Sequence, residues 1–503
     1  MLLVYLSLPI VVIFLTYGTL TTRNPFFFGM IWVLPLAVLL TNRLDWWLTL
    51  VLWLTATNIR LPGVLGKLEL VHLLAAGLVG IIFARYVIQK QGIPHRGTFW
   101  WFFYLFGAVV VMIMAVRGTG FRLLGDTQWG GMLYVQLMIS MVLAYSIGHI
   151  RLTPRQWQIG LVGMFAFASL PFLADAVYLL SKGAIYQQYY LIHVGSVAGE
   201  IDSMMEGLGA TRFRKGGALG YAIAIIPCLL FPFRGNKRLI FFACWVIALF
   251  FGGISGHRLA IVQIGGFIWL YCFWMMKGKR IALIGFTAIA SCMIIAVLTI
   301  TVRYLPLPIQ RSISFIPIIE IDPATAWQAQ TTVDWRVKVW QRALEEELPQ
   351  YWLIGEGITT SESIQTAVHL AYDSAQWALD LNLYHNGPIS LIIGYGVIGL
   401  IAGLGVFVMG AWYHARIPSA DWNDSLLQRL HQVLLIRLII GIGIFIFVFG
   451  NGDRACARLF MDLGILYALS LANIRIGEET QAAATVEQVD LSSPRQMRRI
   501  SPV

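Results

Sequence analysis

Long apolar runs separated by short polar segments dominate the chain. A helix needs about 20 apolar residues to cross the hydrocarbon layer of a bilayer, and its backbone polar groups must be satisfied within the helix. The pattern therefore predicts an all-α polytopic membrane protein with about 12 to 14 transmembrane helices, the lower number applying if two short runs do not span. The apolar runs lie at about 1–20, 26–40, 44–55, 70–85, 98–115, 131–147, 157–180, 217–232, 239–254, 257–276, 281–301, 386–411, 431–449 and 458–473, those at 26–40 and 44–55 being the short ones.

Composition agrees with this interpretation and excludes a soluble globular protein. The 503 residues are 58% hydrophobic and only 12% charged, with a mean hydropathy of +0.73, whereas soluble domains carry about 25% charged residues. The alternation expected of a membrane β-barrel is missing from the sequence. The five cysteines lie in or beside apolar runs without the spacing of a disulfide framework or a metal site, so they are expected to be small buried residues.

The net charge of +11 is best explained by the positive-inside rule, because Lys and Arg gather in short loops that alternate through the predicted spans. We expect no nucleic-acid partner. The basic loops and the basic tail fall on one side, which is then cytoplasmic, and place the other connections outside. The cytoplasmic clusters are at 85–96, 151–155, 234–238, 277–280 and 495–499, and the outside segments are 181–216, 253–257, 302–385 and 450–457.

The longest outside segment contains five tryptophans, so we expect it to fold. Arg336, Trp340 and Ala343 are spaced as on one face of a helix, and Pro349 is expected to end that helix. The polar C-terminal stretch is typical of a disordered tail. The predicted organisation is a transmembrane bundle at 1–301, a large and partly helical loop at 302–385, C-terminal transmembrane helices at 386–476 and a disordered cytoplasmic tail at 477–503.

Three clusters of basic residues are predicted on the outside. Arg258 follows the tight turn Ser255-Gly256-His257 at the start of a span, Arg336 shares a helical face with Trp340, and a third cluster precedes Gly216. An outside basic cluster runs against the positive-inside rule and needs an anionic partner, for which guanidinium groups favour phosphate. The structural alternatives are a snorkelling side chain for Arg258 and a cation–π pair for Arg336. The third cluster consists of Arg212, Arg214 and Lys215.

A histidine stands at the point where the long loop re-enters the membrane. His385 precedes Asn386, a favourable N-cap, and Pro388, which the first helical turn tolerates. The positive end of the helix dipole disfavours an imidazolium, so a neutral histidine able to accept a proton is expected there. Weaker candidates are His369, Asp453 and Arg454, and Asp175 is the only notable acid expected near a span interior.

Arginines and one potential base on the same side suggest a site for a lipid-linked diphosphate. The arginines would neutralise charge on a departing diphosphate, and the histidine would deprotonate an attacking hydroxyl. The sequence shows no DxD-like metal pair near these motifs.

These motifs resemble those of the O-antigen ligase and O-antigen polymerase superfamily of bacterial inner-membrane glycosyltransferases. His385-Asn386 followed by Gly396 and Gly399 is similar to the family's histidine–asparagine helix with two late glycines. Its arginine–tryptophan–proline–GxG stretch is matched by Arg336, Trp340, Pro349, Gly355 and Gly357, its serine/glycine–arginine turn by Ser255 to Arg258, and its earlier arginine by Arg212 or Arg214.

The resemblance implies a metal-independent transferase of the membrane glycosyltransferase-C type, without a cofactor, whose active site faces the periplasm. The donor would be an undecaprenyl-diphosphate-linked glycan. The acceptor would be a sugar hydroxyl on lipid A-core, on another lipid-linked repeat or on a protein, so that ligase and polymerase both stay open. His385 would be the base and Arg258 and Arg336 the diphosphate clamps. Further substrate contacts are expected from Arg212, Arg214, Lys215, Trp340, Tyr384 and Asn386.

Two other functions are compatible with the sequence. A flippase for lipid-linked oligosaccharides should show two similar halves and ionisable residues inside its spans, and the basic residues here gather at the outer span ends instead. A non-enzymatic scaffold is the third possibility, and envelope-biogenesis proteins are possible partners in each case.

Overall fold

The structure is a computed structural model, in which every described element is a helix. It describes residues 43–55, 70–89, 97–118, 131–173, 176, 213, 215–357, 375, 378–379, 382–448, 450 and 454–492. The predicted spans at 1–20 and 26–40 lie outside these residues. Each later predicted span coincides with an apolar helix, which confirms the prediction of an all-α polytopic membrane protein.

Eight of the described helices are long and apolar enough to cross a membrane. They are α5 (Phe99–Arg117), α7 (Pro154–Ala168, with its apolar span continuing to Leu173), α12 (Lys237–Ile254), α13 (Arg258–Met275), α14 (Arg280–Thr301), α20 (Gly387–Ala415), α21 (Ser425–Phe447) and α22 (Arg454–Ser492). The other apolar helices are α3 (Leu44–Leu54), α4 (Leu70–Gln89), α6 (Met132–Ser146) with the 3₁₀ turn η1 (Ile147–His149), and α11 (Gly216–Leu230).

Helix α3 is too short to span a bilayer. Its 11 residues rise only about 16 Å, against a hydrocarbon layer of about 30 Å. Trp47, Leu48 and Leu52 are buried, and α3 packs on α4 and α7. It packs within the bundle without spanning the bilayer, and its short apolar run had suggested that it does not span.

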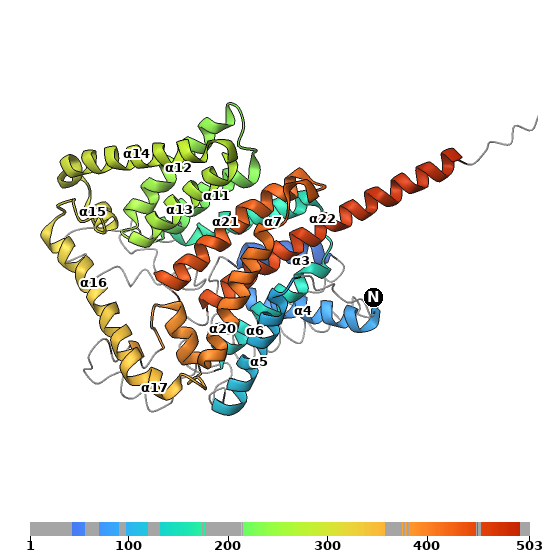
Figure 1. Ribbon diagram of the computed structural model, residues 1–503, viewed down its shortest axis with the longest axis horizontal. Helices are drawn as coiled ribbons and strands as arrows, with labels where there is room; N and C mark the ends of the chain where they lie inside the picture. Colours follow the sequence, from blue (N-terminus) through green and yellow to red (C-terminus); the bar gives the residue numbers. More distant parts are fainter. Residues whose placement is uncertain are drawn as a thin grey trace, which may run out of the picture.

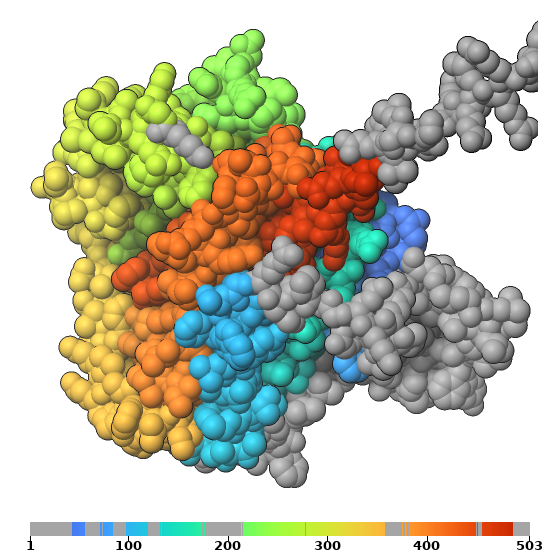
Figure 2. All heavy atoms as spheres, turned by 45° about the vertical axis from the view of Figure 1, so that its right-hand side comes forward, coloured from blue at the N-terminus to red at the C-terminus, as the bar shows by residue number. Residues whose placement is uncertain are grey.

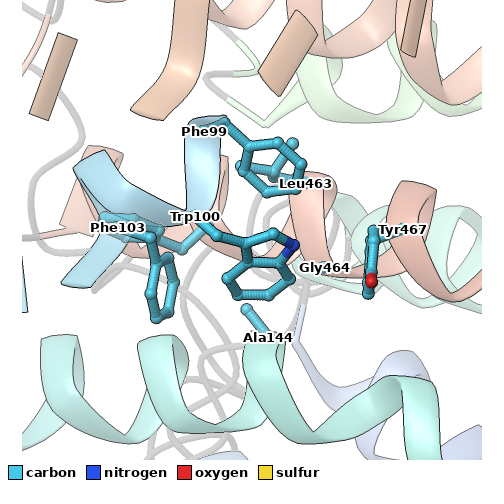
Figure 3. Close-up of a pocket in the computed structure, with 8 residues that line it drawn as sticks. Phe99, Trp100, Phe103, Ala144, Leu463, Gly464 and Tyr467 are labelled. Atoms are coloured by element: carbon cyan, nitrogen blue, oxygen red, sulfur yellow. The ribbon is translucent and has the colours of Figure 1, made fainter. Parts of the chain in front are cut away.

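Helix α20 lies at the centre of the bundle. It packs along α5 and also contacts α21 and α22, and Figure 2 shows the surfaces of α5 and α20 directly beside each other. At the inner face of α5, the Trp100 ring meets Phe103 at 5.1 Å and Tyr467 of α22 at 5.0 Å between centroids. Gly464 allows the close approach, because a Cβ there would lie 2.6 Å from the Cα of Ala144. These residues line a crevice with room for no more than about one water molecule (Figure 3).

The segment between α14 and α20 contains further short helices. They are η4 (Val302–Tyr304), α15 (Leu307–Ile313), α16 (Pro323–Arg342), the π-helical turn η5 (Ala343–Glu347) and α17 (Leu348–Tyr351). Helix α16 runs along one edge of the molecule from α15 to α17 (Figure 1). A second, smaller hydrophobic core joins α16 to the segment before α20 and to α20 itself, through Val339, Tyr384 and Ile393.

Pro349 does not end the helix in the way its position suggested. Proline removes one backbone N–H, and its ring clashes with the carbonyl four residues earlier in an α-helix. The chain widens into the π-helical turn immediately before Pro349, which then occupies the first turn of α17. Wide turns of this kind resolve such a clash.

The C-terminal region differs from the predicted disordered tail. Helix α22 continues to Ser492 and extends away from the rest of the molecule (Figure 1). Glu478, Glu479, Gln481 and the following alanines are strong helix formers, so the helix propagates without a hydrophobic partner.

Candidate active site

His385 lies immediately before the first turn of α20. Asn386 is the N-cap, and its side chain accepts a hydrogen bond from the Ile389 N–H at 3.1 Å. The His385 backbone has φ of +52°, a left-handed conformation that costs a non-glycine residue about 1 kcal/mol or more. Its ring packs against Trp335 of α16, with 5.5 Å between centroids. The histidine is thus held between two helices.

The residue before His385 is fixed from α16 and the turn that follows it. The Trp340 indole N–H donates to the Tyr384 carbonyl oxygen at 2.7 Å. The Tyr384 side chain is buried, and its hydroxyl donates to Glu347 Oε2 at 2.5 Å. The Trp340 indole N–H, the Tyr384 hydroxyl and the Asn386 side-chain oxygen are therefore engaged with the protein itself.

Arg258, Arg336 and His385 come together at this point. Arg258 is the first residue of α13, and its Nη2 donates to the Ala329 carbonyl of α16 at 3.1 Å. Burial, and then the charge of Arg258, lower the pKa of Arg336. Burial, and then the charge of Arg336, lower the pKa of His385 to about 4. The Arg336 guanidinium therefore lies close enough to both Arg258 and His385 to interact with each electrostatically, and the histidine is neutral at pH 7.

The turn before Arg258 is built by a buried serine. The Ser255 hydroxyl donates to the Gly252 carbonyl at 2.6 Å and accepts from the His257 N–H at 3.2 Å. Gly256 has φ of +68°, which favours glycine. Ser255 thus shapes the turn that delivers Arg258 to the start of α13.

The third basic cluster approaches the same turn. Lys215 is at the N-cap position of α11. A Cβ on Gly217 would lie 2.8 Å from the Cβ of Ala260, and a Cβ on Gly216 would lie 2.8 Å from the Phe251 carbonyl oxygen. The start of α11 therefore touches the region that presents Arg258. Arg212 and Arg214 lie outside the described residues.

The glycines of the family-like motifs meet at a break in α20. Gly396 has φ of +71° and ψ of −179° inside this helix, which interrupts its hydrogen bonds. An extended segment supplies the missing partners: Glu356 N–H donates to the Ile393 carbonyl at 2.7 Å, and Val397 N–H donates to the Trp352 carbonyl at 2.7 Å. Irregular backbone at membrane depth is tolerated only when the protein satisfies it in this way.

Gly355 lets the extended segment lie against the broken helix. A Cβ at Gly355 would be 2.3 Å from the Gly394 carbonyl oxygen, and a Cβ at Gly396 would be 2.3 Å from that of Leu353. Arg117, at the end of α5, donates from Nε to the Gly355 carbonyl at 3.0 Å and fixes the segment from the other side. The GxG motif therefore allows the backbone of the extended segment to pack directly against the backbone of α20.

Replacing Gly396 with alanine is expected to lower the free energy of unfolding by about 2–4 kcal/mol, because alanine is strained at this φ and ψ and would push Leu353 away. Thermal unfolding in detergent measures the loss. Gly285→Ala is the matched control, since nothing lies within 4 Å of a Cβ there. Equal melting temperatures for the two variants would contradict the docking role.

Several features were not anticipated from the sequence. Asp462 is buried inside the predicted span of α22 and pairs with Arg437 of α21 at 3.2 Å, so Asp175 is not the only notable acid near a span interior. A charged residue inside each of the two apolar runs, Arg437 in one and Asp462 in the other, was the available signal. Glu347 and Arg117 each form a hydrogen bond with a residue distant in the sequence, Tyr384 and Gly355 respectively. Asp175, His369 and Asp453 lie outside the described residues, and Arg454 begins α22.

In the described part of the chain, no three His, Cys, Asp or Glu side chains lie together in a way that could hold a metal ion. The five cysteines are free.

Comparison with known proteins agrees with the motifs. No match is found among curated proteins. The family model described as O-antigen ligase matches residues 243–404, roughly a third of the chain. The matched region contains Arg258, Arg336, His385 and the glycines at the break in α20, and it begins after Lys215. Over this region the chain is similar to the O-antigen ligase family, which agrees with the resemblance of its motifs to the O-antigen ligase and polymerase superfamily.

Proposed function

We propose that the protein is a metal-independent membrane glycosyltransferase. It moves a glycan from an undecaprenyl-diphosphate donor to a sugar hydroxyl acceptor at the periplasmic face of the bacterial inner membrane. The observation that carries the proposal is the convergence of Arg258 and Arg336 beside His385.

The two arginines form the donor site. Half-buried guanidinium groups that repel each other, as the lowered pKa of Arg336 indicates, are stabilised by a shared anion. A diphosphate offers several oxygens to two planar donor forks. Lys215, and with it Arg212 and Arg214, would extend the positive charge toward the lipid.

His385 acts as the base. The acceptor hydroxyl oxygen attacks the anomeric carbon of the donor sugar while its proton passes to the imidazole. The bond between the anomeric carbon and the diphosphate oxygen breaks, and undecaprenyl diphosphate leaves with the electron pair. Arg258 and Arg336 stabilise the charge that develops on the leaving group. Trp340, Tyr384 and Asn386 hold His385 in place.

The sidedness of the site follows from the helix ends. The starts of α11, α13 and α20 all border it, and the basic turn η3 (Lys277–Lys279) lies at the opposite end of α13. Because basic loops stay in the cytoplasm, the site faces the periplasm. The segment 302–385, which is largely helical in its described residues, then forms the periplasmic part between the bundle at 1–301 and the C-terminal spans at 386–476.

The test uses the purified protein in EDTA with a synthetic undecaprenyl-diphosphate oligosaccharide. We expect release of undecaprenyl diphosphate when a suitable acceptor is present. Lipid A-core is the acceptor in one arm and a second lipid-linked repeat in the other, so the productive arm distinguishes ligase from polymerase. Loss of release in EDTA, with recovery on adding Mg²⁺, would overturn the metal-independent mechanism.

A lipid-linked oligosaccharide flippase is the second candidate, favoured by one observation. Arg437 and Asp462 form an ion pair inside the spans, and intramembrane charges often mark transport pathways. Movement of a fluorescent lipid-linked oligosaccharide across proteoliposomes, without release of undecaprenyl diphosphate, would favour this function.

A further inference from the structure

The backbone that presents His385 carries two residues in an uncommon conformation. Asn382 has φ of +54° and His385 has φ of +52°. Non-glycine residues hold the left-handed region only when surrounding contacts impose it. The position of the imidazole therefore depends on what fixes the short segment between these residues.

Tyr384 provides that fixation. Its ring is fully buried in the second hydrophobic core, and its carbonyl oxygen accepts from the Trp340 indole. Its hydroxyl lies 2.5 Å from Glu347 Oε2 and 2.8 Å from Asn382 Oδ1. One side chain thus ties both left-handed residues to the turn between α16 and α17.

Three consecutive glutamates stand in this turn, and the one whose carboxylate accepts the hydrogen bond of the Tyr384 hydroxyl is Glu347. It is the last residue of the π-helical turn. Glu345 and Glu346 are exposed. Burial, and then the carboxylate of Glu347, raise the pKa of Tyr384 well above its usual value, so its hydroxyl remains a donor in a strong charge-assisted bond.

We propose that Glu347 is a positioning residue for His385: it holds the Tyr384 hydroxyl and so fixes the backbone that aims the imidazole at the acceptor hydroxyl. This inference rests on the proposed function and names a residue that acts through Tyr384 without touching substrate.

The test compares Glu347→Ala, Tyr384→Phe and their combination with Glu346→Gln, a matched control in the same turn. Release of undecaprenyl diphosphate is followed over a range of donor concentrations. We expect kcat to fall about a hundredfold for Glu347→Ala, as for a base displaced by about 1 Å, with the donor KM unchanged. The double variant should lose no more than either single variant, because both break one connection. Glu347→Gln keeps an acceptor oxygen and should recover part of the rate.

A second readout does not depend on turnover. The nine histidines are labelled with ¹³C, and His385 is assigned from the signal missing in His385→Gln. In Glu347→Ala, a loosened and better solvated imidazole should titrate at higher pH than in the wild type, while Glu346→Gln should leave the titration unchanged.

The outcomes separate the two proposals. A wild type that releases nothing with either acceptor contradicts the proposed function, and the titration still decides the role of Glu347. A wild type that is active, with Glu347→Ala within twofold of it and an unchanged His385 titration, overturns the positioning role. Losses that multiply in the double variant overturn the connection through Tyr384.

Discussion

Replacing His385 with alanine is expected to lower kcat for undecaprenyl diphosphate release by about 10²–10⁴-fold, the usual contribution of a positioned general base. The imidazole lies beside Arg336 and is neutral at pH 7 because burial and then the Arg336 charge hold its pKa at about 4. Alanine removes the proton acceptor and leaves both arginines in place. Binding of undecaprenyl diphosphate should therefore persist, and binding and single-turnover release are measured side by side.

The control is His149→Ala, which removes a histidine in η1, a turn that packs on α6 and α22. Added imidazole should restore part of the rate of His385→Ala, because it can enter the space left by the side chain. If the variant instead loses binding of undecaprenyl diphosphate and keeps its turnover at saturating donor, His385 is a donor-binding residue and the assignment as base is wrong.

The membrane architecture could be predicted because it depends on local apolar runs. Every span predicted from 44–55 onward coincides with a described helix, and even the shortness of α3 was visible in its sequence. The π-helical turn could be anticipated only in part. Pro349 signalled a disturbance, but whether the helix stops or widens depends on packing against Tyr384 and Val339.

The site illustrates a different limit. Residue types and sides of the membrane suggested that Arg258, Arg336 and His385 belong together, since each has a recognisable local context. The residues that hold the site in place have no such local context. Glu347 meets Tyr384 across 37 positions, and Arg117 meets Gly355 across 238 positions. Such pairs follow from tertiary packing, and a single sequence carries no pattern for them.

The glycines combine a pattern that is visible in the sequence with a role that depends on tertiary packing. Gly355 and Gly396 were visible as motif residues, but their reason lies in the structure. An extended segment replaces the hydrogen bonds of a broken membrane helix and holds the end of the α16–α17 region against α20. The same break therefore anchors the turn that carries Glu347 and the helix that begins after His385.

Replacing Arg336 with lysine is expected to lower kcat/KM by about 10²–10³-fold, the loss typical of removing one donor that stabilises a developing anion. One ammonium cannot reproduce the guanidinium fork. Lys338→Gln is the matched control, because it removes a positive charge from an exposed position of the same helix. A rate for Arg336→Lys within threefold of the wild type would show that a point charge is sufficient.

The pH dependence of Arg336→Gln tests the electrostatic coupling directly. Only neutral His385 accepts a proton, so kcat/KM should be constant above the pKa of the free enzyme and fall below it. In the wild type this acidic limb lies near pH 4. Arg336→Gln removes the repulsion and should move the limb to higher pH, but not as far as 6.5, because burial is the larger cause of the shift.

Bound donor should raise the pKa of His385, as the substitution Arg336→Gln is expected to do. The diphosphate charge offsets Arg258 and Arg336, so protonation of His385 becomes easier in the complex than in the free enzyme. The acidic limb of kcat, which reports the complex, should therefore lie at higher pH than that of kcat/KM in the wild type. The separation should shrink in Arg336→Gln and remain in Lys338→Gln. Coinciding limbs in the wild type would mean that the diphosphate does not lie beside the arginines and His385, and the base would then have to be sought elsewhere in the site.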